Sequence, residues 1–165
     1  MSEGNEQFLK LAERIRDEFI DLDRLAERVQ AGWHQAQSSG DDLYLDSVAL
    51  NLHGFYQGIE RLFEMIATLV DGAMPQGAAW YQILLQQMAA DVPRTRPPVI
   101  SEETRVVLDE YRGFRHIVRH VYTFKFDPAK IQRLAEGAPA VLIQVRQELL
   151  DFANFLDQLA QDNGK

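Results

Sequence analysis

Residues 8–29 read FLKLAERIRDEFIDLDRLAERV. Their apolar positions recur at steps of three and four, which is the spacing of one face of an α-helix. Charged residues fill most of the remaining positions, so we predict an amphipathic helix with one face against a core. Residues 38–42 (SSGDD) are expected to end this helix, because serine, glycine and aspartate favour turns and helix caps.

Other segments repeat this helical pattern. A second helix is expected from about residue 43 to residue 70, ended by Asp71 and Gly72. A shorter helix should cover roughly residues 79–90. Three prolines within residues 91–98 exclude a helix there, so this segment is predicted to be a loop.

The C-terminal third of the chain predicts two more helices. One begins after an N-cap at Ser101 and should end near residues 123–126. The last runs over about residues 128–161 and is expected to be broken or bent near residues 137–139, which contain a proline. No segment alternates like a strand. We therefore predict an all-α, up-and-down bundle of four to five helices, as one domain spanning residues 1–165.

Composition excludes several classes of protein. The 165-residue chain is 46% hydrophobic, which is too apolar for a disordered chain. It has no cysteine, so disulfides, thiolate metal sites and cysteine nucleophiles are excluded. No apolar run approaches the ~18 residues of a membrane span, and the polar N-terminus lacks a signal-peptide pattern. A soluble, cytoplasmic protein without a membrane partner is expected.

Charge is distributed unevenly along the chain. The formal net charge is -8, which argues against a protein that coats nucleic acid, and no DNA partner is expected. Residues 111–130 nevertheless contain five basic residues and one acid. Within them, residues 115–122 read RHIVRHVY, with no acid at all. A local site for RNA is therefore compatible with the acidic total.

Helical geometry divides the 115–122 segment into two polar sectors. Arg115, Arg119 and Tyr122 are expected to share one face, with Arg112 one turn earlier. The remaining polar positions, His116 and His120, form a second pair in the adjoining sector.

These residue types suit metal-free cleavage of RNA. An arginine can bind a phosphate in bidentate fashion, and a nearby histidine can move a proton near neutral pH. Such a reaction needs a base for the 2'-hydroxyl, a cation for the phosphorane charge and an acid for the leaving 5'-oxygen.

Plainer interpretations remain open. A helix with several arginines and histidines is often a solvated face or an ion-pair partner of acidic helices. The two histidines could also bind zinc together with a carboxylate from another helix, as in a metal-binding or adaptor bundle.

The spacing Arg115-x4-His120-x-Tyr122, late in an all-helical chain of this size, resembles the HEPN superfamily and specifically its HepT-like toxin ribonucleases. The resemblance implies the toxin of a type VII-like HEPN/MNT toxin–antitoxin system. Such a toxin is a homodimeric, metal-independent endoribonuclease without a cofactor, whose composite site lies at the dimer interface. The alternative is a non-catalytic HEPN module that binds a nucleotide or a partner.

The resemblance also implies roles for individual residues. Arg115 and His120 would be catalytic, with His116 and Arg119 in support. Its partners would be RNA and a minimal nucleotidyltransferase antitoxin, which could neutralise the toxin by transferring AMP to Tyr122. From their charge, we add Arg112 and Lys125 as candidates for RNA binding.

Several other residues have two possible interpretations. His34 and His53 stand alone and are expected to be surface or core histidines. Glu60 and Glu64 are expected on a solvated face, with pairing between this patch and Arg115 as the alternative. The three aromatic residues that could stack bases are Trp33, Trp80 and Tyr81, although core anchoring is favoured for both tryptophans.

Overall fold

The longest helix is bounded by the residues that flank it. The computed structural model describes residues 2–164, and in it helix α1 spans Glu3–Ser39. The Ser2 side chain accepts a hydrogen bond from the Asn5 backbone N–H at the start of the helix. At the other end Gly40 has φ 69°, a left-handed conformation that glycine adopts without a steric penalty. The predicted end of the first helix is confirmed.

The chain is otherwise a succession of helices joined by short connections. Its elements after α1 are α2 (Leu43–Ile66), the π-helical turn η1 (Ala67–Asp71), α3 (Trp80–Ala89), α4 (Glu102–His120), the 3₁₀ turn η2 (Thr123–Lys125) and α5 (Pro128–Asn163). No strand occurs among residues 2–164. The all-α class and the helical bundle predicted from the sequence are confirmed.

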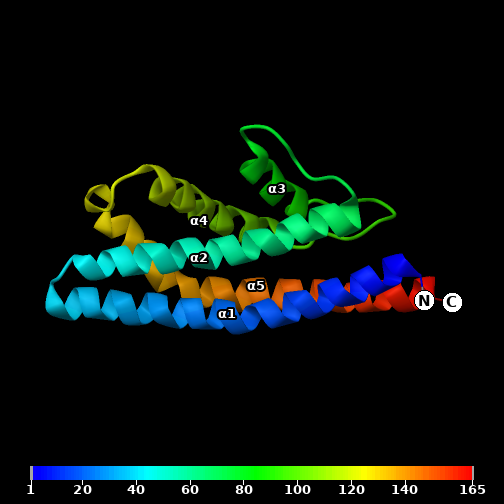
Figure 1. Ribbon diagram of the computed structural model, residues 1–165, viewed down its shortest axis with the longest axis horizontal. Coiled ribbons are helices and arrows are strands. Elements are labelled where there is room, and N and C mark those ends of the chain that lie inside the picture. The colour runs from blue at the N-terminus through cyan, green and yellow to red at the C-terminus, as the bar shows by residue number, and fades with distance from the viewer. Residues whose placement is uncertain (1, 165) are drawn as a thin grey trace.

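Three long helices form the body of the bundle. Helix α1 packs along both α2 and α5, and the two ends of the chain lie at the same end of the bundle (Figure 1). Helix α4 packs on α2, and the short α3 packs on α4. This arrangement brings α3 and α4 together on the side of α2 away from α1.

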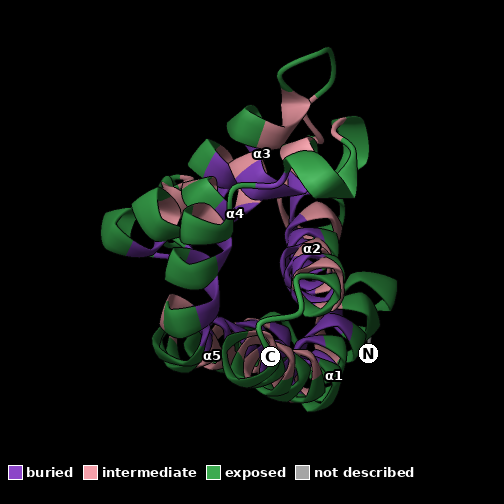
Figure 2. Cartoon of the chain, turned by 90° about the vertical axis from the view of Figure 1, so that its left-hand side faces the viewer, coloured by how far each residue is buried: buried purple, intermediate pink, exposed green. Residues whose placement is uncertain are grey.

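The core lies between the inward faces of α1, α2, α4 and α5 (Figure 2). Helix α2 contributes its largest side chains, because Phe55, Tyr56 and Phe63 are each at most 1% exposed. Burial of such a side chain contributes about 1.5–3 kcal/mol, so α2 is held firmly in place. Within residues 2–164, no helix is both long and apolar enough to cross a bilayer.

Helix α4 ends at His120, before the predicted end near residues 123–126. Val121 has extended backbone angles (φ -123°, ψ 141°), and Tyr122 is extended as well. The chain has to turn here, because the buried Phe126 ring packs against Phe114 of α4 with ring centroids 6.1 Å apart. The expected common face of Arg115, Arg119 and Tyr122 is therefore wrong for Tyr122, which lies outside the helix.

Helix α5 continues through Pro139. Of the two outcomes expected near this residue, a break or a bend, the break is wrong. Pro139 has no backbone N–H to donate to the carbonyl of Ala135, four residues earlier. The side chain of Gln30 on α1 donates to that carbonyl instead, at 2.6 Å. A tertiary hydrogen bond thus satisfies the acceptor that the proline leaves free. Figure 1 shows the first turns of α5 slanting relative to the rest of the helix, in keeping with a bend.

Candidate functional site

A small cleft of about 210 Å³ opens between α3 and α4. One wall is Tyr81 of α3, and the rest is formed by arginine and histidine side chains of α4. The α4 residues that line it are Arg112, Arg115, His116, Arg119 and His120. Folding therefore brings five of the seven residues singled out in the sequence to one cavity, together with an aromatic ring from another helix.

Arg115 lies at the base of this cleft and is only 9% exposed. Its Nη2 atom is 3.7 Å from Oε1 of Glu60 on α2. Its Cζ atom is 5.4 Å from the centroid of the Tyr81 ring. A cation over an aromatic face gains about 0.5–2 kcal/mol. The guanidinium is thus held between a carboxylate and a ring, without a direct hydrogen bond to Glu60.

Glu60 is buried, at 3% exposure, and contacts the cleft through its ion pair with Arg115. The expectation of a solvated face is wrong for this residue, and the alternative of a pair with Arg115 is confirmed. Burial raises the pKa of the Glu60 carboxyl to about 6, against the opposing charge of Arg115. Glu64 raises this pKa further, whereas Arg119 and Arg112 lower it.

The Glu60–Arg115 pair is incompletely bonded. Oε2 of Glu60 and Nε of Arg115 are both buried, and neither has a hydrogen-bond partner among residues 2–164. Leaving a buried polar atom unpaired costs about 1–3 kcal/mol. The pair therefore keeps Arg115 near the cleft while leaving donor capacity on the guanidinium.

The two histidines stack on each other at the exposed end of α4. Their ring centroids are 4.2 Å apart and their planes differ by 18°. Nδ1 of His120 lies 2.9 Å from the backbone carbonyl of His116. A carbonyl only accepts, so Nδ1 carries the proton, and Nε2 of the neutral ring is the free acceptor. His120 is therefore oriented as a proton acceptor.

The cleft has a positive local potential. Arg112 donates from Nε to Asp109 at 2.7 Å, which partly balances its charge. Within residues 2–164, no carboxylate lies in ion-pair range of Arg119, His116 or His120.

His53, on the neighbouring face of α2, responds to this potential. Its pKa is lowered by burial first, and then by Arg115 and Arg119. The sequence could only rank His53 as an isolated histidine, whereas the fold places it beside the cations of the cleft.

Tyr122 and Lys125 lie outside the cleft. Both follow the end of α4 and are exposed, Tyr122 by 72%. The Tyr122 ring is nearly parallel to that of Phe124, with centroids 5.6 Å apart. These residues adjoin the cleft along the chain without lining it.

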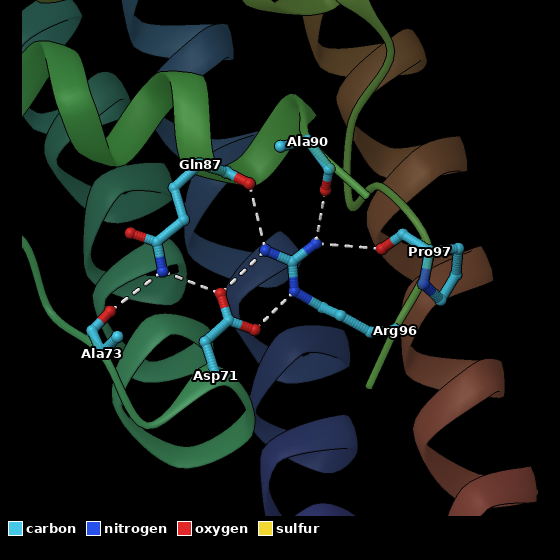
Figure 3. Close-up of polar contacts among 6 residues, drawn as sticks. All are labelled: Asp71, Ala73, Gln87, Ala90, Arg96 and Pro97. Atoms are coloured by element: carbon cyan, nitrogen blue, oxygen red, sulfur yellow. Dashed lines mark hydrogen bonds and ion pairs between the residues drawn. The ribbon is translucent and has the colours of Figure 1, made fainter. Parts of the chain in front are cut away.

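A buried arginine fixes the position of α3. The Arg96 side chain is fully buried and pairs with Asp71 through two bonds of 2.6 and 2.8 Å (Figure 3). Its other three N–H groups donate to the carbonyls of Gln87, Ala90 and Pro97. All five guanidinium donors are therefore used.

The same network joins the end of η1 to α3. The side chain of Gln87 donates to Asp71 and to the carbonyl of Ala73 (Figure 3). This bonding ties α3 and the following loop to η1, and so sets where Tyr81 stands over the cleft. The sequence carried no clear signal for this anchor, because Arg96 and Asp71 meet only in the folded chain.

Trp33, Trp80 and His34 lie outside the lining of the cleft. Trp33 and Trp80 are half-buried and pack against the core, which agrees with the favoured interpretation. His34 is exposed on α1. Among residues 2–164, no three His, Asp or Glu side chains gather as ligands for one metal ion.

Comparison with known proteins adds one finding. The family model described as "HepT-like protein" matches residues 47–156, which run from α2 into α5 and include the whole Arg115–Tyr122 motif. No curated protein and no solved structure matches the chain. Because the match covers most of the sequence and all of the cleft, the chain belongs to the family of HepT-like proteins, within the HEPN superfamily.

Proposed function

We propose that this protein is the toxin of a HEPN/MNT toxin–antitoxin pair and that it cleaves RNA without a metal ion. The observation that carries the proposal is the cleft in which Arg115 and His120 lie together under a positive potential. Membership of the HepT-like family supports the toxin role. The packing of α1 along α2 and α5 supports a single HEPN domain.

In the proposed reaction, His120 acts as the base. Nε2 takes the proton of a ribose 2'-hydroxyl, and the resulting oxygen attacks the neighbouring phosphorus. The bond from phosphorus to the 5'-oxygen breaks, and this oxygen takes a proton from an acid. Arg115 and Arg119 stabilise the negative charge that grows on the phosphorane. DNA lacks the 2'-hydroxyl and is not a substrate of this reaction.

The acid has to stand on the opposite side of the scissile bond from the base. His116 and His120 stack on one side of α4, so one copy of the chain cannot supply both groups in opposed positions. We therefore propose a two-fold homodimer in which the partner's α4 provides the second imidazole. His116 then serves to orient His120, and Arg112 and Lys125 bind flanking phosphates.

The proposed off-switch is Tyr122. Its phenol is exposed, so a nucleotidyltransferase antitoxin can reach it. The phenol oxygen attacks the α-phosphorus of ATP, the phenol proton is lost and pyrophosphate leaves. The AMP group adds a negative charge close to Arg119 and competes with RNA for the cations of the cleft.

A cleavage assay on the purified protein tests the nuclease proposal. His120→Ala and Arg115→Ala should each lower the rate at least about 100-fold, since general base and charge-stabilising groups contribute this much. His34→Ala and Arg133→Ala are matched controls, because both residues are exposed and outside the cleft. Circular dichroism would verify folding.

Two results would contradict the nuclease proposal. One is full cleavage by a folded His120→Ala protein. The other is activity that EDTA abolishes and added metal restores. Partner binding without cleavage of any RNA would instead indicate the non-catalytic HEPN module.

A further inference from the structure

Two aromatic rings stand exposed just beyond the end of α4. Tyr122 is 72% exposed and Phe124 is 81% exposed. Their planes differ by 8°, so the pair presents parallel ring faces at the surface. Single exposed apolar side chains such as Ile20 and Ile143 are ordinary on a protein surface, whereas two parallel rings side by side form an apolar patch of the kind that contacts a ligand or a partner.

The backbone holds these rings outward. Lys125 N–H donates to the Tyr122 carbonyl at 2.9 Å, and Phe126 N–H donates to the Thr123 carbonyl at 3.1 Å. On the C-terminal side the turn is anchored by the buried Phe126 ring. The rings are thus displayed by an ordered turn.

This aromatic pair follows the residues of the cationic cleft closely along the chain. Phe124 follows His120 by four residues, so the two Cα atoms are at most about 14 Å apart. Arg119 precedes the pair along the chain, and Lys125 follows it. Inside the cleft, Tyr81 lies beside Arg115. Cations flanked by aromatic rings are typical of surfaces that bind single-stranded nucleic acid.

We propose that Tyr122 and Phe124 form a stacking platform that holds an unpaired base of the RNA bound at the cleft. The bases of a duplex already stack on one another and offer no free face, whereas an unpaired base can lie on an exposed ring. This inference rests on the proposed function, because it adds a base-binding surface to the cleft that would bind the RNA backbone.

Charge determines which side of Phe124 the RNA backbone follows. The ring also borders a second pocket, whose lining includes Asp42 and Asp46 at the start of α2. These carboxylates repel phosphates. The strand therefore runs along the α4 side, between Phe124 and Arg115.

Binding of an uncleavable RNA tests the platform. The wild-type protein would be titrated against a fluorescent single-stranded oligonucleotide whose 2'-hydroxyls are methylated, and against its duplex, with anisotropy as the readout. Phe124→Ala and Phe124→Leu should weaken single-strand binding by about 5-fold to 100-fold, the size of a lost base–aromatic stack. Phe124→Trp should retain it, and duplex binding should change little. Ile143→Ala is the matched control, because Ile143 is 67% exposed and belongs to α5.

Three results would overturn the platform: wild-type affinity in Phe124→Leu, equal loss on single strand and duplex, or a change of oligomeric state in Phe124→Ala. The last would mean that the rings belong to a protein interface. Cleavage of unmodified RNA is measured separately. Phe124-dependent binding without cleavage would refute only the nuclease, and cleavage with unaltered binding in Phe124→Ala and Phe124→Leu would refute only the platform.

Discussion

Oε1 of Glu60 lies 3.7 Å from Nη2 of Arg115, and both side chains are almost completely buried. A buried carboxylate thus supports the one arginine at the base of the cleft. Its pKa of about 6 exceeds the ordinary value of 4.5, so the folded protein binds this proton more tightly than the unfolded chain does.

Glu60 therefore makes stability depend on pH. The free energy of unfolding should fall as pH rises from 4.5 through 6, by about 2 kcal/mol for a shift of this size. The Gln side chain of Glu60→Gln cannot titrate. The free energy of unfolding of the wild-type protein should therefore fall by this amount relative to that of the variant between pH 4.5 and 7. Urea denaturation at several pH values measures the difference. Glu13→Gln, at an exposed position of α1, is the control. If the difference in unfolding free energy between wild type and Glu60→Gln did not change with pH, Glu60 would not titrate in this range.

The two stacked histidines should differ in how much each contributes to the rate of RNA cleavage. His116→Ala removes a ring but keeps the backbone carbonyl that holds Nδ1 of His120. We expect cleavage to fall by about 10-fold or less in His116→Ala, and by about 100-fold or more in His120→Ala. Single-turnover rates at saturating RNA make the comparison. Equal losses in the two variants would assign both rings to the chemical step.

The Arg96 network should be essential for the position of α3. Arg96→Ala leaves Asp71 buried without its partner, which costs about 3–5 kcal/mol. Arg94→Ala is the matched control, because Arg94 is exposed in the same loop. Urea unfolding measures the loss, and a change below about 1 kcal/mol, the usual value of an exposed pair, would mean that the network is dispensable.

Tyr122 should be the residue that accepts AMP. Coexpression with the proposed nucleotidyltransferase antitoxin should add mass in multiples of one AMP group, and Tyr122→Phe should abolish the gain. Tyr44→Phe should retain it, since Tyr44 is a partly exposed tyrosine on α2, away from the motif. Neutralisation of the wild-type protein without any mass change would indicate inhibition by binding alone.

Features that depend on local hydrogen bonds could be predicted well. Ser101 caps α4 by accepting from Thr104 N–H, and Asp127 caps α5 by accepting from Ala129 N–H. The end of α4 could not be predicted from local sequence, because the packing of Phe126 against Phe114 determines it. The continuity of α5 through Pro139 likewise depends on Gln30, a residue of another helix.

The sequence by itself determined the helices and the arginines and histidines of α4, because helical period and capping are properties of neighbouring residues. Only the tertiary structure decided that Glu60 and Tyr81 would enclose Arg115, and that Tyr122 would leave the helix face. The physical reason is that these relationships join side chains from different helices. Their partners are selected by core packing and by the burial of charge, and neither is visible in the spacing of residues along one segment.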